Sequence, residues 1–118
     1  MAKVLIAEDT AFMRMVIKNI LTDKGHEVVA EALDGEDCIN KYEEFRPDIV
    51  FMDIVMPNME GIDALKRIME IDPDAKVIMC SSIGQQSVIT EAIKLGAKDF
   101  IMKPFEVEKV LDVVDKVI

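Results

Sequence analysis

Two hydrophobic patterns alternate along this chain. Short apolar runs with the length and composition of buried strands cover residues 3–7, 27–32, 49–52, 75–80 and 99–102. Between and after these runs, apolar residues recur every three or four positions, as they do in amphipathic helices. Strands that alternate with helices through short connections predict a parallel sheet covered by helices on both faces.

Local signals mark the ends of the predicted helices. Thr10 is expected to cap the first helix by accepting hydrogen bonds from its free N–H groups, and Gly25 to end it. Asp34 and Gly35 turn the chain into a helix over residues 36–45. The apolar stripes of the second and fourth helices include Phe45 and Ile93, and both side chains are predicted to face the core.

Composition narrows the class of protein. The 118 residues are expected to form one domain over 1–118, and no apolar run approaches the ~18 residues that cross a membrane. The N-terminus lacks the pattern of a signal peptide, so the sequence predicts a cytoplasmic protein. Cys38 and Cys80 lack metal-type spacing and are predicted to be free thiols.

The charge of the chain bears on its partners. A formal net charge of −9 argues against a nucleic-acid-binding protein, because phosphate contacts need a basic face. The same charge is compatible with divalent cations and with basic protein partners.

Four of the five predicted strands end on polar groups. Glu8 and Asp9 follow the first strand, Asp53 ends the third, Ser81 the fourth, and Lys103 follows the fifth. Parallel strands bring their carboxyl ends to one edge of the sheet, where α/β proteins bind ligands. Ionised carboxylates beside a core are usually paired or bind a cation.

The chemistry of these residue types favours phosphoryl transfer. Three carboxylates without histidine or cysteine form a hard oxygen site of the kind that Mg²⁺ prefers. A lysine and a hydroxyl opposite the metal suit the oxygens of a phosphoryl group, and Asp53 is placed to act as the nucleophile. Taken one at a time, these residues also have ordinary structural explanations. The acid pair could be a solvated strand end before a helix, where acids favour the helix dipole, Ser81 could be a turn hydroxyl, and Lys103 could be a surface lysine. Their joint occurrence at separate strand ends favours a site.

Three segments and this polar set carry a family resemblance. The segments are Ala-Phe-Met-Arg-Met at 11–15, Met-Pro-Asn-Met-Glu-Gly at 56–61 and Gly-Ala-Lys-Asp-Phe-Ile-Met-Lys-Pro-Phe at 96–105. Over its whole length the chain resembles the receiver domain of two-component response regulators, most of all single-domain chemotaxis regulators of the CheY type. The resemblance implies a flavodoxin-like (βα)5 fold, doubly wound, with a five-stranded parallel sheet. Its strand order would be 2-1-3-4-5, of which CheY is itself a standard example.

The resemblance also implies a phosphoacceptor and a metal site. Asp53 would accept a phosphoryl group from a phosphohistidine on a CheA-like histidine kinase. Asp9, Asp53 and the backbone carbonyl of Val55 would ligate Mg²⁺ directly, and Glu8 would act through water. The protein would assist its own phosphorylation and also its own dephosphorylation, which would be slow. It would not be an enzyme in the usual sense.

Further residues would form the switch and set its lifetime. Ser81 would hydrogen-bond the phosphoryl group and Lys103 would pair with it, next to a cis bond before Pro104. Phe100 would follow Ser81 inward and change the face formed by residues 84–118, as a population shift between two states. Val55 and Ile83 are both apolar, so neither is expected to orient a hydrolytic water, and autodephosphorylation should be slow.

Several functions remain open at this point. The first is a monomeric switch that binds a flagellar or archaellar motor switch or adaptor protein, because a chain without an output domain must act on another protein. The second is a phosphorelay carrier that passes its phosphoryl group to another histidine protein. A turnover phosphatase would need a second aspartate where Val55 stands, and a flavin-binding domain would need a Ser/Thr/Gly-rich loop after the first strand.

Overall fold

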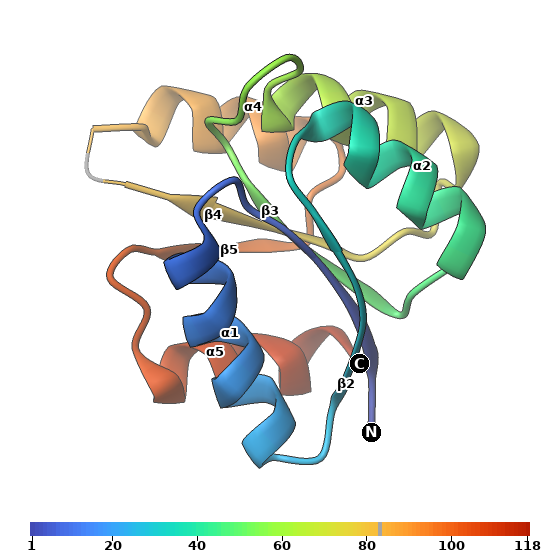
Figure 1. Ribbon diagram of the computed structural model, residues 1–118. Coiled ribbons are helices and arrows are strands. Elements are labelled where there is room, and N and C mark those ends of the chain that lie inside the picture. The colour runs from blue at the N-terminus through green and yellow to red at the C-terminus, as the bar shows by residue number, and fades with distance from the viewer. Residues whose placement is uncertain (83) are drawn as a thin grey trace.

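The protein is a three-layer α/β structure (Figure 1). The computed structural model describes residues 1–82 and 84–118. In this part of the chain strands and helices alternate as β1 Lys3–Ala7, α1 Ala11–Asp23, β2 Glu27–Ala32, α2 Gly35–Phe45, β3 Ile49–Asp53, α3 Gly61–Ile71, β4 Val77–Ser81, α4 Gln86–Leu95, β5 Asp99–Met102 and α5 Val107–Val117. The strands form one parallel sheet in the order β2-β1-β3-β4-β5. The predicted flavodoxin-like fold and its strand order are confirmed.

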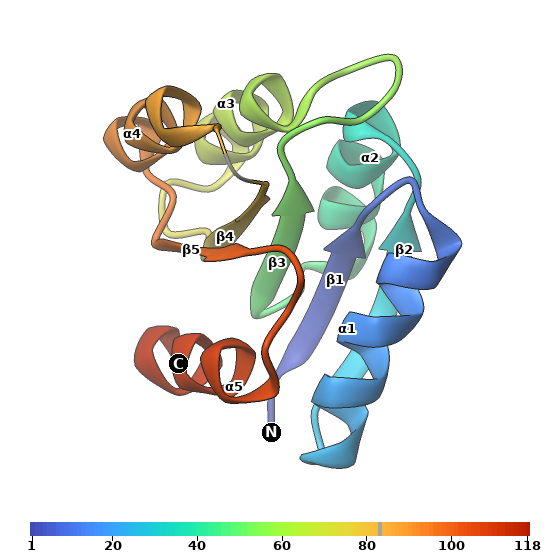
Figure 2. The same ribbon diagram turned by 90° about the vertical axis from the view of Figure 1, so that its left-hand side faces the viewer.

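Two hydrophobic cores lie on opposite faces of the sheet. Helices α1 and α5 cover one face, whereas α2, α3 and α4 cover the other (Figures 1 and 2). Successive side chains of a strand point to opposite faces, so Phe51 of β3 packs in the first core and Val50 and Met52 pack in the second. Because both faces are covered, β3 is apolar at every position before Asp53.

The ends of the helices confirm most of the predicted signals. Asp34 caps α2, where its side chain accepts a hydrogen bond from the Asp37 N–H at 2.8 Å. Gly25 follows the end of α1 with a positive φ of 85°. The side-chain cap predicted for Thr10 is wrong, since only its backbone carbonyl takes part, accepting from the Arg14 N–H at 3.1 Å. Residue type favours a cap position but does not fix the rotamer of the hydroxyl.

Two predicted core side chains face solvent instead. Phe45 is 41% exposed and Ile93 is 44% exposed. Phe45 is the last residue of α2, and Ala92 is the buried residue of α4, which covers the edge of the sheet. An apolar stripe can therefore be wider than the strip of helix that contacts the sheet. Cys38 and Cys80 are buried free thiols, as predicted.

The helices are short. In the part of the chain that the structure describes, no helix is long and apolar enough to pass through a bilayer.

Candidate functional site

The polar residues predicted to meet follow the carboxyl ends of four neighbouring strands. Figure 2 shows β1 and β3 running side by side in the same direction. Glu8 follows the end of β1, and Asp53 is the last residue of β3. Ser81 ends β4, and Lys103 follows β5, where its N–H donates to the Ser81 carbonyl at 2.8 Å. The sheet thus brings together residues up to 95 positions apart in sequence.

Three carboxylates form the centre of this cluster. Carboxylate oxygens of Glu8, Asp9 and Asp53 lie within 4.8 Å of one another. The Glu8 and Asp53 side chains are only 3% and 9% exposed, whereas Asp9 is exposed. The Lys103 Nζ donates to Glu8 Oε1 at 2.8 Å and to Asp53 Oδ2 at 3.0 Å. The one ammonium therefore pairs with two of the three carboxylates.

The electrostatics show that Lys103 alone does not balance the negative charge of the cluster. Burial, together with the neighbouring Asp53, raises the pKa of Glu8 from 4.5 to about 7 and outweighs the opposing effect of Lys103. Burial by itself would lower the pKa of Lys103, but its hydrogen bonds to Glu8 and Asp53 outweigh that effect and raise this pKa. Without another cation, the site holds its full negative charge only at a cost in free energy.

A divalent cation fits this set of groups. The donors are hard carboxylate oxygens, and they are gathered closely enough to share one ion. Asp9 lies on the exposed side of the cluster, which gives room for the water ligands that Mg²⁺ retains. The residues present therefore form an acidic cluster that could bind a metal, with Glu8, Asp9 and Asp53 as the groups around it.

The remaining predicted site residues lie around this cluster or outside the described residues. Ser81 is buried one position beyond Cys80, which pairs with Asp53 across β3 and β4. Phe100 is 41% exposed on β5, and a hollow lies between it and Ser81. Val55 follows β3 with a side chain that is 55% exposed. Ile83 lies outside the described residues.

One close packing contact holds the strand that carries Asp53. A Cβ at Gly61 would overlap the carbonyl oxygen of Asp53, so the start of α3 lies directly against the end of β3. The Gly61 N–H also donates to the Ile54 carbonyl at 2.8 Å. The bond between Lys103 and Pro104 is cis, as the resemblance predicted.

Residue patterns alone assign no role to Arg14, although this residue contacts the site. Its guanidinium donates to the backbone carbonyl of Glu8 at 2.6 Å. A basic residue in the first turns of a helix after an acid pair was the available signal. The contact depends on how α1 packs against the end of β1, which that local signal does not specify.

Comparison with known proteins identifies the family. Residues 4–115 match the family model described as the response regulator receiver domain. The chain belongs to this family. Receiver domains related to CheY are signalling proteins that generally act as phosphoacceptors rather than as conventional enzymes, and the chain falls in this group.

Individual relatives agree with this assignment. The chain is 56% identical to the chemotaxis protein CheY of Thermotoga maritima, over 98% of this chain and 96% of that protein. It is 55% identical to CheY of Bacillus subtilis, over 97% of this chain and 95% of that protein. Among solved structures, the CheX–CheY–BeF3–Mg²⁺ complex of Borrelia burgdorferi superimposes with a TM-score of 0.93 at 40% identity, covering 98% of this chain and 87% of that chain. The resemblance inferred from the sequence is confirmed.

Proposed function

We propose that this chain is a single receiver domain over residues 1–118 that works as a phosphorylation switch in chemotaxis. Asp53 accepts a phosphoryl group from a phosphohistidine on a CheA-like histidine kinase. The observation that carries the proposal is the position of the Asp53 carboxylate, which is buried at a strand end, gathered with two acids and 3.0 Å from the Lys103 ammonium. Its relatives named as chemotaxis proteins support the pathway class.

The transfer needs positioning and neutralisation of charge. An Asp53 carboxylate oxygen attacks phosphorus, and the bond between phosphorus and the imidazole nitrogen breaks. Its electron pair returns to the imidazole, which takes a proton from solvent, and an acyl phosphate remains on Asp53. The Lys103 ammonium pairs with the phosphoryl oxygens, and the Ser81 hydroxyl donates a hydrogen bond to them.

A Mg²⁺ ion fits among the acidic groups. Asp9, Asp53 and the backbone carbonyl of Val55 would hold it directly, and Glu8 would act through water. The ion supplies positive charge that offsets both the clustered carboxylates and the incoming phosphoryl group.

Phosphorylation changes partner binding through the side of the sheet formed by α4, β5 and α5. The hollow between Ser81 and Phe100 gives the aromatic ring a place to move when the hydroxyl engages the phosphoryl group. The two conformations then differ in population. The partner is a flagellar or archaellar motor switch or adaptor protein, and the chain acts as a cytoplasmic monomer. Val55 and Ile83 are both apolar, and Ile83 lies outside the described residues. Neither side chain can orient a water molecule toward the acyl phosphate, so hydrolysis is slow.

The test uses acetyl phosphate as a small phosphodonor. Wild type is expected to gain one phosphoryl group only when Mg²⁺ is present, as followed by mass spectrometry of the intact protein. The Asp53→Asn variant should gain none, whereas Asp48→Asn, directly before the same strand, should match wild type. A label on Asp9 would contradict the assignment.

The same labelled protein separates the switch from a phosphorelay carrier. Label that moves from Asp53 to a histidine protein other than the kinase would favour the carrier. Retention of the label, with tighter binding to a motor protein, supports the switch.

A further inference from the structure

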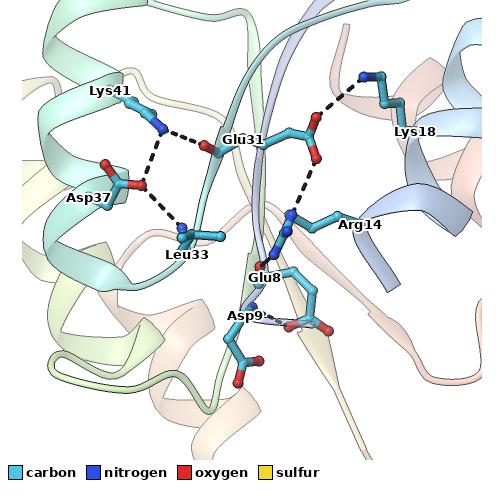
Figure 3. Close-up of polar contacts among 8 residues, drawn as sticks. All are labelled: Glu8, Asp9, Arg14, Lys18, Glu31, Leu33, Asp37 and Lys41. Carbon is cyan, nitrogen blue, oxygen red and sulfur yellow. Dashed lines mark hydrogen bonds and ion pairs between the residues drawn. The ribbon is translucent and has the colours of Figure 1, made fainter. Parts of the chain in front are cut away.

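A polar network connects the acid pair to β2, the edge strand that pairs with β1. Figure 3 shows Arg14 of α1 lying between the end of β1 and Glu31 of β2. The Arg14 Nη1 donates to the Glu8 carbonyl at 2.6 Å, and its Nε donates to Glu31 Oε1 at 3.3 Å. The Arg14 side chain is 15% exposed and the Glu31 side chain is 35% exposed, so these contacts are partly shielded from solvent.

The carbonyl that Arg14 binds lies just beyond the strand pairing. The last β1 residue paired with β2 and β3 is Ala7. The Glu8 N–H still donates to the Ala32 carbonyl at 3.0 Å, but the Glu8 carbonyl belongs to the turn that leads into α1. A charged donor on this oxygen forms a stronger hydrogen bond than a neutral one.

The peptide group between Glu8 and Asp9 is consequently held at both ends. Arg14 donates to the carbonyl oxygen of this peptide, which belongs to Glu8. The N–H of the same peptide, which belongs to Asp9, donates to Glu8 Oε2 at 3.0 Å. The orientation of this one peptide plane sets the directions in which the Glu8 and Asp9 side chains leave the backbone. These are two of the three carboxylates gathered within 4.8 Å.

Glu31 in turn is fixed from two helices. Its side chain accepts from Arg14 and also from Lys18 Nζ at 3.3 Å. Its backbone carbonyl accepts from Lys41 of α2, whose Nζ lies 2.6 Å away (Figure 3). Arg14 therefore takes its position from an anchored strand rather than from a mobile surface partner.

We propose that Arg14 is a positioning residue for the metal site. Through the Glu8 carbonyl it holds the acid pair in the orientation that lets Glu8 and Asp9 act together with Asp53, and Glu31 holds Arg14 in place. This inference rests on the proposed Mg²⁺ site. Partners that orient metal ligands typically contribute roughly 10-fold or more to metal affinity.

Simple electrostatics predicts the opposite sign. Removing a cation near an acidic cluster should strengthen Mg²⁺ binding, because the negative potential at the cluster rises. Loss of positioning should weaken it. Arg14→Met keeps an apolar stem and removes the donor. Lys18→Met is the control, because Lys18 lies on the same helix and also pairs with Glu31. This variant removes one positive charge but leaves the hydrogen bond from Arg14 to the Glu8 carbonyl in place.

The experiment measures Mg²⁺ affinity of the full chain by calorimetry, and the Asp9 amide signal by NMR without metal. Arg14→Met should raise the dissociation constant roughly 10-fold and move the Asp9 amide signal, whereas Lys18→Met should bind as tightly as wild type or slightly tighter. Equal affinities in wild type and Arg14→Met would overturn the inference, as would equal weakening in both variants.

Two outcomes separate this inference from the function on which it rests. If wild type binds no Mg²⁺, both the metal site and the positioning role are refuted. If wild type binds and Arg14→Met binds equally well, only the positioning role is refuted. Should Arg14→Met fail to fold, Glu31→Gln replaces it. That variant leaves the contact to Glu8 possible but loosens Arg14, so a smaller loss of affinity supports the inference and an unchanged affinity overturns it.

Discussion

Replacing Glu8 by glutamine should stabilise the metal-free protein at high pH. Glu8 is buried, and its pKa rises from 4.5 to about 7 on folding. Between these two values the folded protein keeps a proton on Glu8 that the unfolded chain releases. The free energy of unfolding of wild type must therefore fall as pH rises through this window, and the loss is complete above the folded-state pKa.

The pKa shift sets the size of the effect. A change from 4.5 to about 7 corresponds to an upper limit of about 3 kcal/mol. The side chain is 3% exposed, so solvent screens little of this energy. Glutamine has nearly the same shape but no charge to bury, and it loses the ion pair with Lys103. We expect the difference in unfolding free energy between variant and wild type to move by about 1–3 kcal/mol in favour of the variant between pH 5 and pH 8.

Urea denaturation followed by circular dichroism, with EDTA present, measures this difference. Glu44→Gln on the exposed side of α2 is the matched control and should follow the pH dependence of wild type. Adding Mg²⁺ at pH 8 should restore stability to wild type more than to Glu8→Gln, because the ion offsets the repulsion among the carboxylates. Parallel pH profiles for wild type and Glu8→Gln would refute the reasoning.

Two further substitutions test the surroundings of Asp53. Gly61→Ala should lower the free energy of unfolding by about 1–3 kcal/mol and slow phosphorylation by acetyl phosphate, because its Cβ would displace the Asp53 carbonyl; a melting temperature and labelling rate equal to those of wild type would contradict this close contact. Val55→Asn should shorten the lifetime of the phosphorylated protein, since an amide beside the acyl phosphate can orient a water. The side chain is 55% exposed, so the fold should tolerate the change. The decay of label after removal of the donor gives the rate, and an unchanged rate would show that position 55 does not set the lifetime.

The candidate site shows how far residue patterns lead. Asp53 was recognisable because a carboxylate directly follows an apolar run. The acid pair of Glu8 and Asp9 was recognisable because it follows the first strand, and Lys103 because it follows the fifth. Parallel strands then imply that these groups meet. The switch roles of Ser81 and Phe100 came from the family resemblance and stay predictions, as does the role of Ile83.

Other features depended on contacts that no local pattern contains. Lys103 pairs with Glu8, which is 95 positions away in sequence, and with Asp53, which is 50 positions away. The burial of Glu8 likewise depends on elements that are distant in sequence. Arg14 gained its role only from the packing of α1 against the end of β1 and against β2. Phe45 and Ile93 have the spacing of core residues but face solvent, because the helix surface that meets the sheet is narrower than the apolar stripe.

The sequence by itself determined the alternation of strands and helices, the two covered faces of the sheet and the types of residue that end each strand. These follow from side-chain periodicity and from local conformational preference, which act over a few residues. Only the tertiary structure decided how deeply each acid is buried, which cation pairs with it and which residue holds the Glu8–Asp9 peptide. Those properties depend on desolvation and on distances between separate elements, and both exist only after the chain has packed.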